Sequence, residues 1–178
     1  SPGPSVGKLV PNIKTTARLL YSIYLGLTVL EIILLVLGAC PLFDAIAIGF
    51  GTAGTGGFAI KNDSLAGYSS YIQWVVTIFM LLFGVNFNAY YLLLFRKFKK
   101  AVSMEEVKAY FGIIIASTLI IFFNIFKYAK PAGTLFRDAA FQVASIITTT
   151  GFATVDFDMW PQTSKTILVM LMFIGACA

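Results

Sequence analysis

The sequence alternates long apolar runs with shorter ones, and two of the shorter runs end in a stretch rich in Gly and Thr, at residues 55–60 and 148–154. In lipid, no water is present to satisfy backbone N–H and C=O groups that leave a helix. Non-helical backbone is therefore tolerated there only where it is buried in protein or lines a wet cavity. The two stretches predict a pathway for something polar through a membrane protein.

The composition supports insertion in a membrane. The chain has 178 residues, of which 58% are hydrophobic and 12% charged, whereas a soluble domain has about 25% charged residues. The absence of His excludes imidazole metal ligands and His-based acid–base catalysis. Cys40 and Cys177 follow no metal or disulfide spacing and are interpreted as small buried hydrophobes.

Apolar runs long enough to span the bilayer predict helices at residues 19–37, 72–95 and 105–126. The first is expected to end at Gly38, with Pro41 preventing its continuation. Ser103 and Glu106 have the spacing of a capping box at the start of the third helix. The last apolar run, residues 166–178, extends only about 20 Å as a helix, so we expect a truncated final helix in a piece of a larger protein.

Two runs, residues 42–50 and 138–147, are too short to span and predict re-entrant helices. Asp44 and Asp138 stand at their expected N-termini, where a carboxylate offsets the helix dipole. The separation of these two residues is 94 (138 − 44), and that of Gly57 and Gly151 is also 94 (151 − 57). One register therefore relates two copies of a unit made of a spanning helix, a re-entrant pore helix, a filter loop and a spanning helix.

The repeat divides the chain into four parts. Residues 1–18 form an N-terminal segment, 19–95 the first pore repeat, 96–109 a basic loop with a helix start, and 110–178 a second pore repeat. The loop holds Arg96, Lys97, Lys99, Lys100 and Lys108. Because cytoplasmic loops are enriched in Lys and Arg, we expect this loop and the N-terminus in the cytoplasm and the Gly/Thr stretches open to the outside. The same placement explains the net charge of +5 without nucleic acid.

The chemistry of the Gly/Thr stretches favours a cation. A dehydrated monovalent cation needs a ring of oxygens, which backbone carbonyls supply. Glycine permits the backbone conformations required, and the C-terminal ends of the pore helices add partial negative charge. The alternative interpretation is a packed Gly-rich turn. The predicted filter residues are Thr55, Gly56, Gly57, Phe58, Thr149, Thr150, Gly151 and Phe152.

Two further features of the sequence bear on function. Glu31 is an acid near the middle of the first spanning helix, with either a structural or an ion-path role and with Asn86, Asn88 or a group beyond this chain as its expected partner. Residues 49–54 spell G-x-G-x-x-G, but a short helix rather than a strand precedes them, which excludes a dinucleotide site. A membrane enzyme using Glu31, Asp156 or Asp158 lacks a nucleophile–base pair, so we predict no enzyme.

These motifs resemble those of a known family. The stretch at residues 148–157 (TTTGFATVDF), followed by Trp160 and Pro161, is similar to the third filter of the Trk-type bacterial potassium uptake proteins of the Trk/Ktr superfamily. The stretch at residues 52–59 (TAGTGGFA) resembles their second filter, and its Thr-Gly-Gly-Phe spelling favours the Trk branch. The run Pro11-Asn12-Ile13 resembles the entry to their second repeat. Residues 175–178 (GACA) resemble the start of their gate loop.

The resemblance implies a potassium-channel-like, all-α membrane protein with four pseudo-equivalent repeats, of which this chain holds the second and most of the third. It implies multi-pass insertion in the bacterial inner membrane, potassium uptake with potassium as substrate and no cofactor in this chain, a homodimer, and a cytosolic nucleotide-binding regulatory subunit. The alternatives are a two-filter cation channel subunit acting as a dimer, a sodium/potassium symporter of the same superfamily, and an assembly factor without transport activity.

Overall fold

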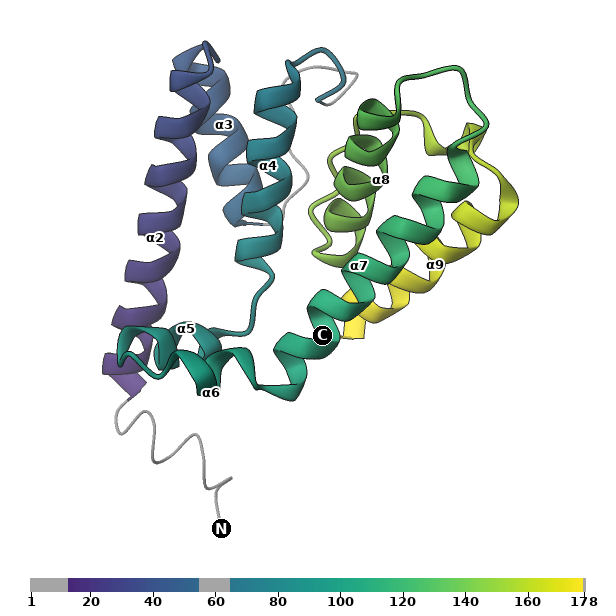
Figure 1. The fold of residues 1–178 in the computed structure, drawn as a ribbon. Coiled ribbons are helices and arrows are strands. Elements are labelled where there is room, and N and C mark those ends of the chain that lie inside the picture. Colours follow the sequence, from purple (N-terminus) through teal and green to yellow (C-terminus); the bar gives the residue numbers. More distant parts are fainter. Residues whose placement is uncertain (1–12, 55–64, 178) are drawn as a thin grey trace.

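The computed structural model describes residues 13–54 and 65–177, all of them in helices and connecting loops with no strand among them (Figure 1). This confirms the all-α fold class. In chain order the elements are α2 (Ile13–Leu37), α3 (Leu42–Ala53), α4 (Ser70–Phe83), α5 (Phe87–Leu94), α6 (Phe98–Val102), α7 (Glu105–Ile125), α8 (Ala132–Ile147), the 3₁₀ turn η1 (Phe157–Met159) and α9 (Gln162–Cys177).

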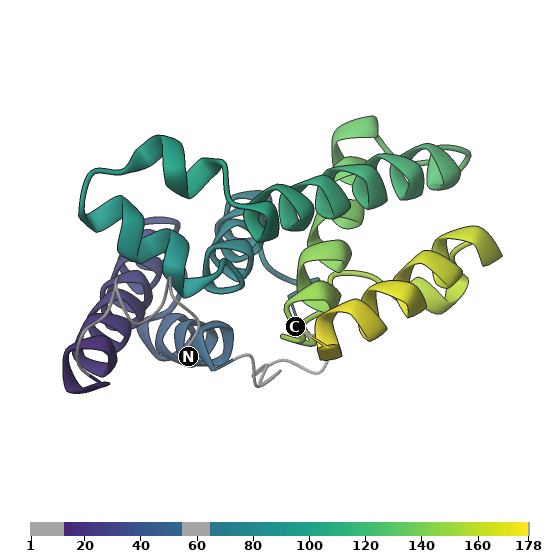
Figure 2. The same ribbon diagram turned by 90° about the horizontal axis from the view of Figure 1, so that it is seen from below.

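The helices form two units with the same order of elements. In the first, the short α3 packs between α2 and α4, and in the second the short α8 packs between α7 and α9 (Figure 1). Helices α2 and α7 are long and apolar enough to cross a membrane, whereas α3 has only 12 residues. The view from below shows the units side by side, joined where α4 meets α8 (Figure 2).

Each unit has its own apolar core. The first is built around Leu35, Ile48 and Phe79, and the second around Ile121 and Leu168. Much apolar surface stays outside these cores: α2 exposes Leu25, Val29 and Ile33, among others. Apolar side chains that face outward in this way are what a bilayer solvates.

The second spanning helix differs from its prediction. Residues 72–95 were expected to form one helix, but α4 ends at Phe83, and α5 leaves at an angle of 90° after a short break. Asn86 begins α5, and its side chain accepts a hydrogen bond from the Asn88 N–H at 2.8 Å. Hydropathy detects that both segments are apolar, but it does not detect the change of direction between them.

The predicted capping box at the start of α7 is wrong. Ser103 has helical backbone angles and ends α6, where its N–H donates to Lys99 O. Met104 instead precedes α7, without a side-chain cap. Because Ser103 is the C-cap of the short α6, its hydroxyl is not placed to cap the next helix.

Three helix starts also lie earlier than predicted. Helix α2 begins at Ile13, α8 at Ala132 after Pro131, and α9 at Gln162 after Pro161. Asp138 is therefore well inside α8 and not at its N-terminus. Hydropathy marks where a helix meets lipid, whereas its hydrogen bonds begin wherever the polar lead-in permits.

Gly38 follows α2 as predicted, but for another reason. The residue with a left-handed backbone is Ala39, with φ of 66°. A Cβ on Gly38 would lie 2.3 Å from the ring of Tyr71, whose hydroxyl donates to Leu34 O at 2.8 Å. The glycine thus lets the start of α4 pack directly on the end of α2.

Candidate functional site

The second Gly/Thr stretch is the loop that follows α8. Of its predicted filter residues, Thr149 and Gly151 are exposed, while Thr150 and Phe152 are buried. The first stretch, with Thr55, Gly56, Gly57 and Phe58, lies outside the described residues, which include only its lead-in at the end of α3.

The backbone of this loop turns several N–H groups toward α8. Thr149 N donates to Ile146 O at 3.1 Å, and the N–H groups of Thr150 and Gly151 both donate to Ser145 O, at 2.9 and 3.4 Å. In a trans peptide the C=O points opposite to the N–H. The carbonyls of Thr148, Thr149 and Thr150 therefore point away from α8, and no described residue donates a hydrogen bond to them.

The positive φ angles explain how consecutive N–H groups reach one acceptor. Thr149 has φ of 57° and Gly151 has φ of 87°, and Thr150 between them is not in that region. Alternation of left- and right-handed residues brings successive N–H groups to one side of the chain. Glycine adopts positive φ without steric cost, whereas a Thr does so only where its surroundings hold it.

Hydroxyl groups supply that support. Thr148 Oγ1 donates to Ala144 O at 2.6 Å and lies 2.8 Å from Thr150 Oγ1. Ser145 Oγ donates to Phe152 O at 2.6 Å. The Thr150 hydroxyl and the Phe152 carbonyl thus face the protein interior, and of the two central threonine side chains only that of Thr149 is exposed.

The segment after Phe152 is anchored to both units. Ala153 O accepts from Leu65 N at 2.9 Å, a contact between the loop of the second unit and the segment that leads into α4. Thr154 Oγ1 donates to Asp138 Oδ1 at 3.2 Å, and Lys130 Nζ lies 3.8 Å from Asp138 Oδ2. Burial raises the pKa of the Asp138 carboxyl, and the charge of Lys130 opposes this shift.

Asp44 occupies the corresponding place in the first unit. It lies in the first turn of α3, and its Oδ2 accepts from the hydroxyl of Tyr68 at 2.8 Å. In both units, a carboxylate on the short helix therefore holds the chain that follows the Gly/Thr stretch. The 94-residue register identifies the pair Asp44 and Asp138, but not their partners.

Glu31 is fully buried in α2, and its partner differs from the one predicted. Thr52 Oγ1 lies 3.0 Å from Glu31 Oε2. Asn86 and Asn88, the predicted partners, are at the start of α5, where they bond each other. The other carboxyl oxygen of Glu31 has no hydrogen-bond partner among the described residues.

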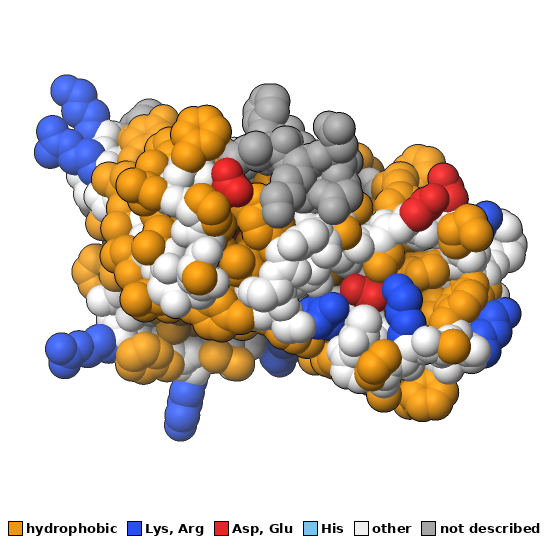
Figure 3. Space-filling model, turned by 90° about the horizontal axis from the view of Figure 1, so that it is seen from above, with side chains coloured by type: hydrophobic (Ala, Val, Ile, Leu, Met, Phe, Trp, Pro, Cys, Tyr) orange, Lys and Arg blue, Asp and Glu red, His pale blue; other side chains and the backbone are white. Residues whose placement is uncertain are grey.

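The face seen from above carries acidic and basic side chains next to one another, among hydrophobic ones (Figure 3). Asp156 and Asp158 are exposed, and Asp156 Oδ1 accepts from the Asp158 N–H at 3.1 Å. No group of three or more Cys, Asp or Glu side chains suited to a metal ion occurs among the described residues.

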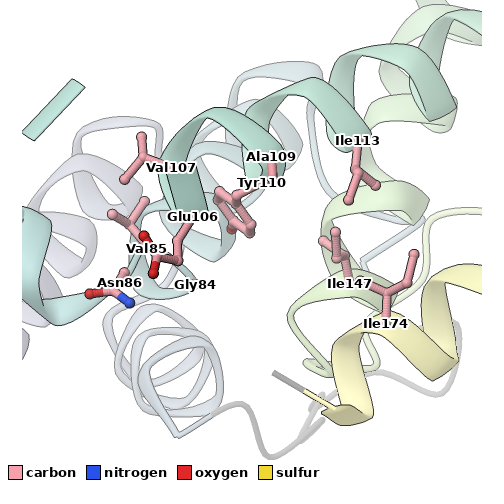
Figure 4. Close-up of a pocket in the computed structure, with 10 residues that line it drawn as sticks. All are labelled: Gly84, Val85, Asn86, Glu106, Val107, Ala109, Tyr110, Ile113, Ile147 and Ile174. Carbon is pink, nitrogen blue, oxygen red and sulfur yellow. The ribbon is translucent and has the colours of Figure 1, made fainter. Parts of the chain in front are cut away.

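A cavity of about 440 Å³ lies below the end of α8. Figure 4 shows Ile113, Ile147 and Ile174 at one end, Glu106 and Asn86 at the other, and Tyr110 between them. The C-terminal end of α8, at Ile147, thus borders a hollow. The dipole of α8 places partial negative charge at this end of the helix, and such charge favours cations.

Sequence reasoning missed several contributors to the loop. Ser145 and Leu65 are not part of any sequence motif. Their roles depend on contacts with residues 150–153, which only the structure shows. Gln142 is 1% exposed, and neither polar atom of its amide has a partner among the described residues. A polar residue inside an apolar helix was the available signal for Ser145 and Gln142.

Comparison with known proteins identifies the family of this chain. The model of the TrkH family, described as cation transport protein, matches residues 5–129 and 113–178. The chain belongs to this family. It is 35% identical to the Trk system potassium uptake protein TrkH of Salmonella typhimurium, with 99% of the chain and 38% of that relative covered. It is 31% identical to the Trk system potassium uptake protein TrkG of Escherichia coli, over 99% of the chain and 37% of the relative.

A solved structure agrees with this family. The crystal structure of the potassium transporter TrkH from Vibrio parahaemolyticus matches with a TM-score of 0.84 and 29% identity, over 96% of this chain and 38% of that one. The chain therefore spans a little over a third of the length of these relatives. Membership of a family of membrane transporters confirms the expectation of a transport protein rather than an enzyme.

Proposed function

We propose that the protein to which this chain belongs carries potassium ions across the cytoplasmic membrane, in the direction of uptake. Relatives named as potassium uptake proteins, at 31–35% identity over almost the whole chain, support the choice of ion. The chain corresponds to about 38% of their length. It therefore contributes part of the pathway.

The observation that carries the proposal is the backbone of the loop after α8. Three consecutive N–H groups, of Thr149, Thr150 and Gly151, point toward α8, so the carbonyls that precede them point the other way. Carbonyls aligned in this manner replace the hydration shell of a potassium ion. Phe152, whose carbonyl accepts from Ser145, anchors the end of this row, and Gly151 permits the turn.

The surroundings of the loop fit a cation. The α8 helix ends at Ile147, directly before the row of carbonyls, and its C-terminal dipole favours positive charge. The exposed Asp156 and Asp158 follow the loop on the outer face, where carboxylates raise the local concentration of cations. By the 94-residue register, residues 55–58, which lie outside the described residues, are the proposed filter residues of the first unit.

The wider assembly is also part of the proposal. We place the protein in the bacterial inner membrane with several crossings, as a homodimer that docks a cytosolic nucleotide-binding regulatory subunit. The family resemblance supports both the homodimer and the regulatory subunit. The basic segment from Arg96 to Lys100, exposed beyond the 90° bend, supports a cytoplasmic position for that end of the molecule.

The test is Gly151→Ser in the full-length protein. Because Gly151 has φ of 87°, a side chain strains the turn and disturbs the carbonyls, and we expect weaker discrimination of potassium from sodium. Rubidium and sodium uptake by a bacterium deficient in potassium uptake measures it. Gly133→Ser is the matched control, since a Cβ there meets nothing within 4 Å. Unchanged ion preference in Gly151→Ser would contradict the filter assignment.

A further inference from the structure

The charge state of Glu31 requires an explanation, because this acid is buried inside a membrane-spanning helix. It lies in the C-terminal half of the membrane-spanning helix α2 with none of its surface exposed, and no Lys or Arg among the described residues pairs with it. An unpaired carboxylate in such surroundings is strongly disfavoured. The carboxyl group of Glu31 is therefore either ionised, so that it can bind the transported cation, or protonated and neutral.

The hydrogen bonds of Thr52 distinguish these two states. Thr52 Oγ1 lies 2.7 Å from Ile48 O, one turn earlier in α3, and 3.0 Å from Glu31 Oε2. A hydroxyl group has a single proton and cannot donate to both oxygens. Thr52 Oγ1 donates this proton to Ile48 O, because that contact is the shorter one and a carbonyl oxygen can only accept. The contact with Glu31 is then favourable only if the carboxyl carries a proton and donates it to Thr52 Oγ1.

The packing around this contact is tight. Gly49, on the same face of α3 as Thr52, lies so close to α2 that a Cβ there would be 2.8 Å from Ile32 Cγ1. Ile32 is the neighbour of Glu31 in the chain. The Glu31–Thr52 contact is therefore the polar part of an otherwise apolar seam between α2 and α3, and it lies three residues before the first Gly/Thr stretch.

The second unit shows what replaces this contact. In the 94-residue register, Glu31 corresponds to Ile125 (31 + 94) and Thr52 to Ile146 (52 + 94). Both isoleucines belong to the second apolar core or pack against it. The second unit therefore has no charged group at the position equivalent to Glu31. This is expected if the position serves to pack two helices together, and it is not expected if the position binds an ion.

We infer that Glu31 is a neutral carboxylic acid that donates its proton to Thr52, and that it acts as a positioning residue for α3 and not as a ligand of the transported ion. The contact fixes the last turns of the first short helix against α2. The transport readouts below rest on the proposed function, whereas the spectroscopic one does not.

The first test uses variants of the full-length protein. Glu31→Gln keeps a donor for Thr52 and should retain wild-type potassium uptake and ion preference. Thr52→Val leaves the carboxyl proton without an acceptor and should lower thermal stability and uptake, while Thr52→Ser restores both. The double variant Glu31→Leu/Thr52→Val, which imitates the second unit, should be more stable than Thr52→Val alone. A folded Glu31→Gln protein that loses potassium uptake would overturn the inference.

The second test needs no transport. The infrared difference spectrum between the wild type and Glu31→Gln at neutral pH should show one carboxylic acid C=O band that the variant lacks, with the carboxylate bands unchanged. Loss of a carboxylate band instead would show that Glu31 is charged. If Gly151→Ser left ion preference unchanged while this acid band was present, the proposed function would fail and the assignment of Glu31 would stand.

Discussion

Ser145 holds the candidate filter loop with both of its oxygen atoms. Its backbone carbonyl accepts from two successive N–H groups, those of Thr150 and Gly151, and its hydroxyl donates to Phe152 O at 2.6 Å. The side chain is fully buried. One residue of α8 therefore sets the direction of the peptide planes on which the proposed carbonyl row depends.

Ser145→Ala should weaken both stability and ion discrimination. Removal of the hydroxyl leaves the Phe152 carbonyl buried without a donor, which costs about 1–3 kcal/mol. Thermal unfolding in detergent and the ratio of rubidium to sodium uptake measure the two effects. The control is Ser164→Ala, a buried serine that donates to Asn124 Oδ1 at 2.6 Å. The control should lose stability without a change in ion preference, and an equal change in both variants would argue against a special role for Ser145.

For single residues, the sequence predicts a backbone requirement more readily than a contact. Because a side chain hinders the conformation of a carbonyl row, the sequence predicts an unusual backbone conformation at Gly151, and this residue has φ of 87°. The inward-facing hydroxyl of Thr150 and the role of Ser145 were not predictable in this way. Both depend on which side of the loop faces α8, and that follows from contacts far from the motif.

At the level of elements, glycines decide how closely helices approach. Gly84 ends α4, and a Cβ there would lie 2.3 Å from the hydroxyl of Tyr110 and 2.7 Å from Thr148 Cγ2. The Tyr110 hydroxyl donates to Leu81 O at 2.8 Å. The end of α4, the start of α7 and the first residue of the filter loop therefore meet at a single glycine.

Gly84→Ala should destabilise the protein by about 1–3 kcal/mol, because the added methyl group overpacks this junction. Gly112→Ala is the matched control, since it lies in the interior of α7 and its Cβ would meet nothing within 4 Å. Thermal melts of the two variants compare them directly. Addition of Tyr110→Phe to Gly84→Ala should recover part of the loss. If the Gly84 and Gly112 variants melted alike, the close approach would have no energetic consequence.

The order of elements was predictable because run length alone separates spanning from re-entrant helices. The apolar run at residues 42–50 is too short to cross, and α3 has 12 residues. The 90° turn after Phe83 was not predictable, since both α4 and α5 are apolar. Gly84, at this turn, lies close to Tyr110, and hydropathy contains no information on such a close approach.

At the scale of the molecule, the loop of the second unit is built into the first. Phe152 follows α8 in the chain, but its side chain belongs to the same apolar core as Phe79 of the first unit, together with Phe141 of α8. Leu65 N donates to Ala153 O beside it. The two units therefore cannot separate without disturbing the candidate filter.

The proposed orientation of both units rests on the basic segment and can be tested by cysteine labelling in the full-length protein. With Cys40 and Cys177 replaced by Ala, Asp158→Cys should react with a membrane-impermeant maleimide in intact cells, because η1 lies on the proposed outer face. Lys99→Cys, exposed on α6, should react only after lysis, since basic loops stay in the cytoplasm.

Leu30→Cys, in the middle of α2 on its exposed apolar side, is the control and should react from neither side. Labelling of Lys99→Cys in intact cells would reverse the orientation. The carbonyl row at residues 148–150 would then face the cytoplasm, and the proposed outer entrance would become the inner one. An outer position for Asp158 together with an inner one for Lys99 would place the loop after α8 where a cation arriving from outside meets it first.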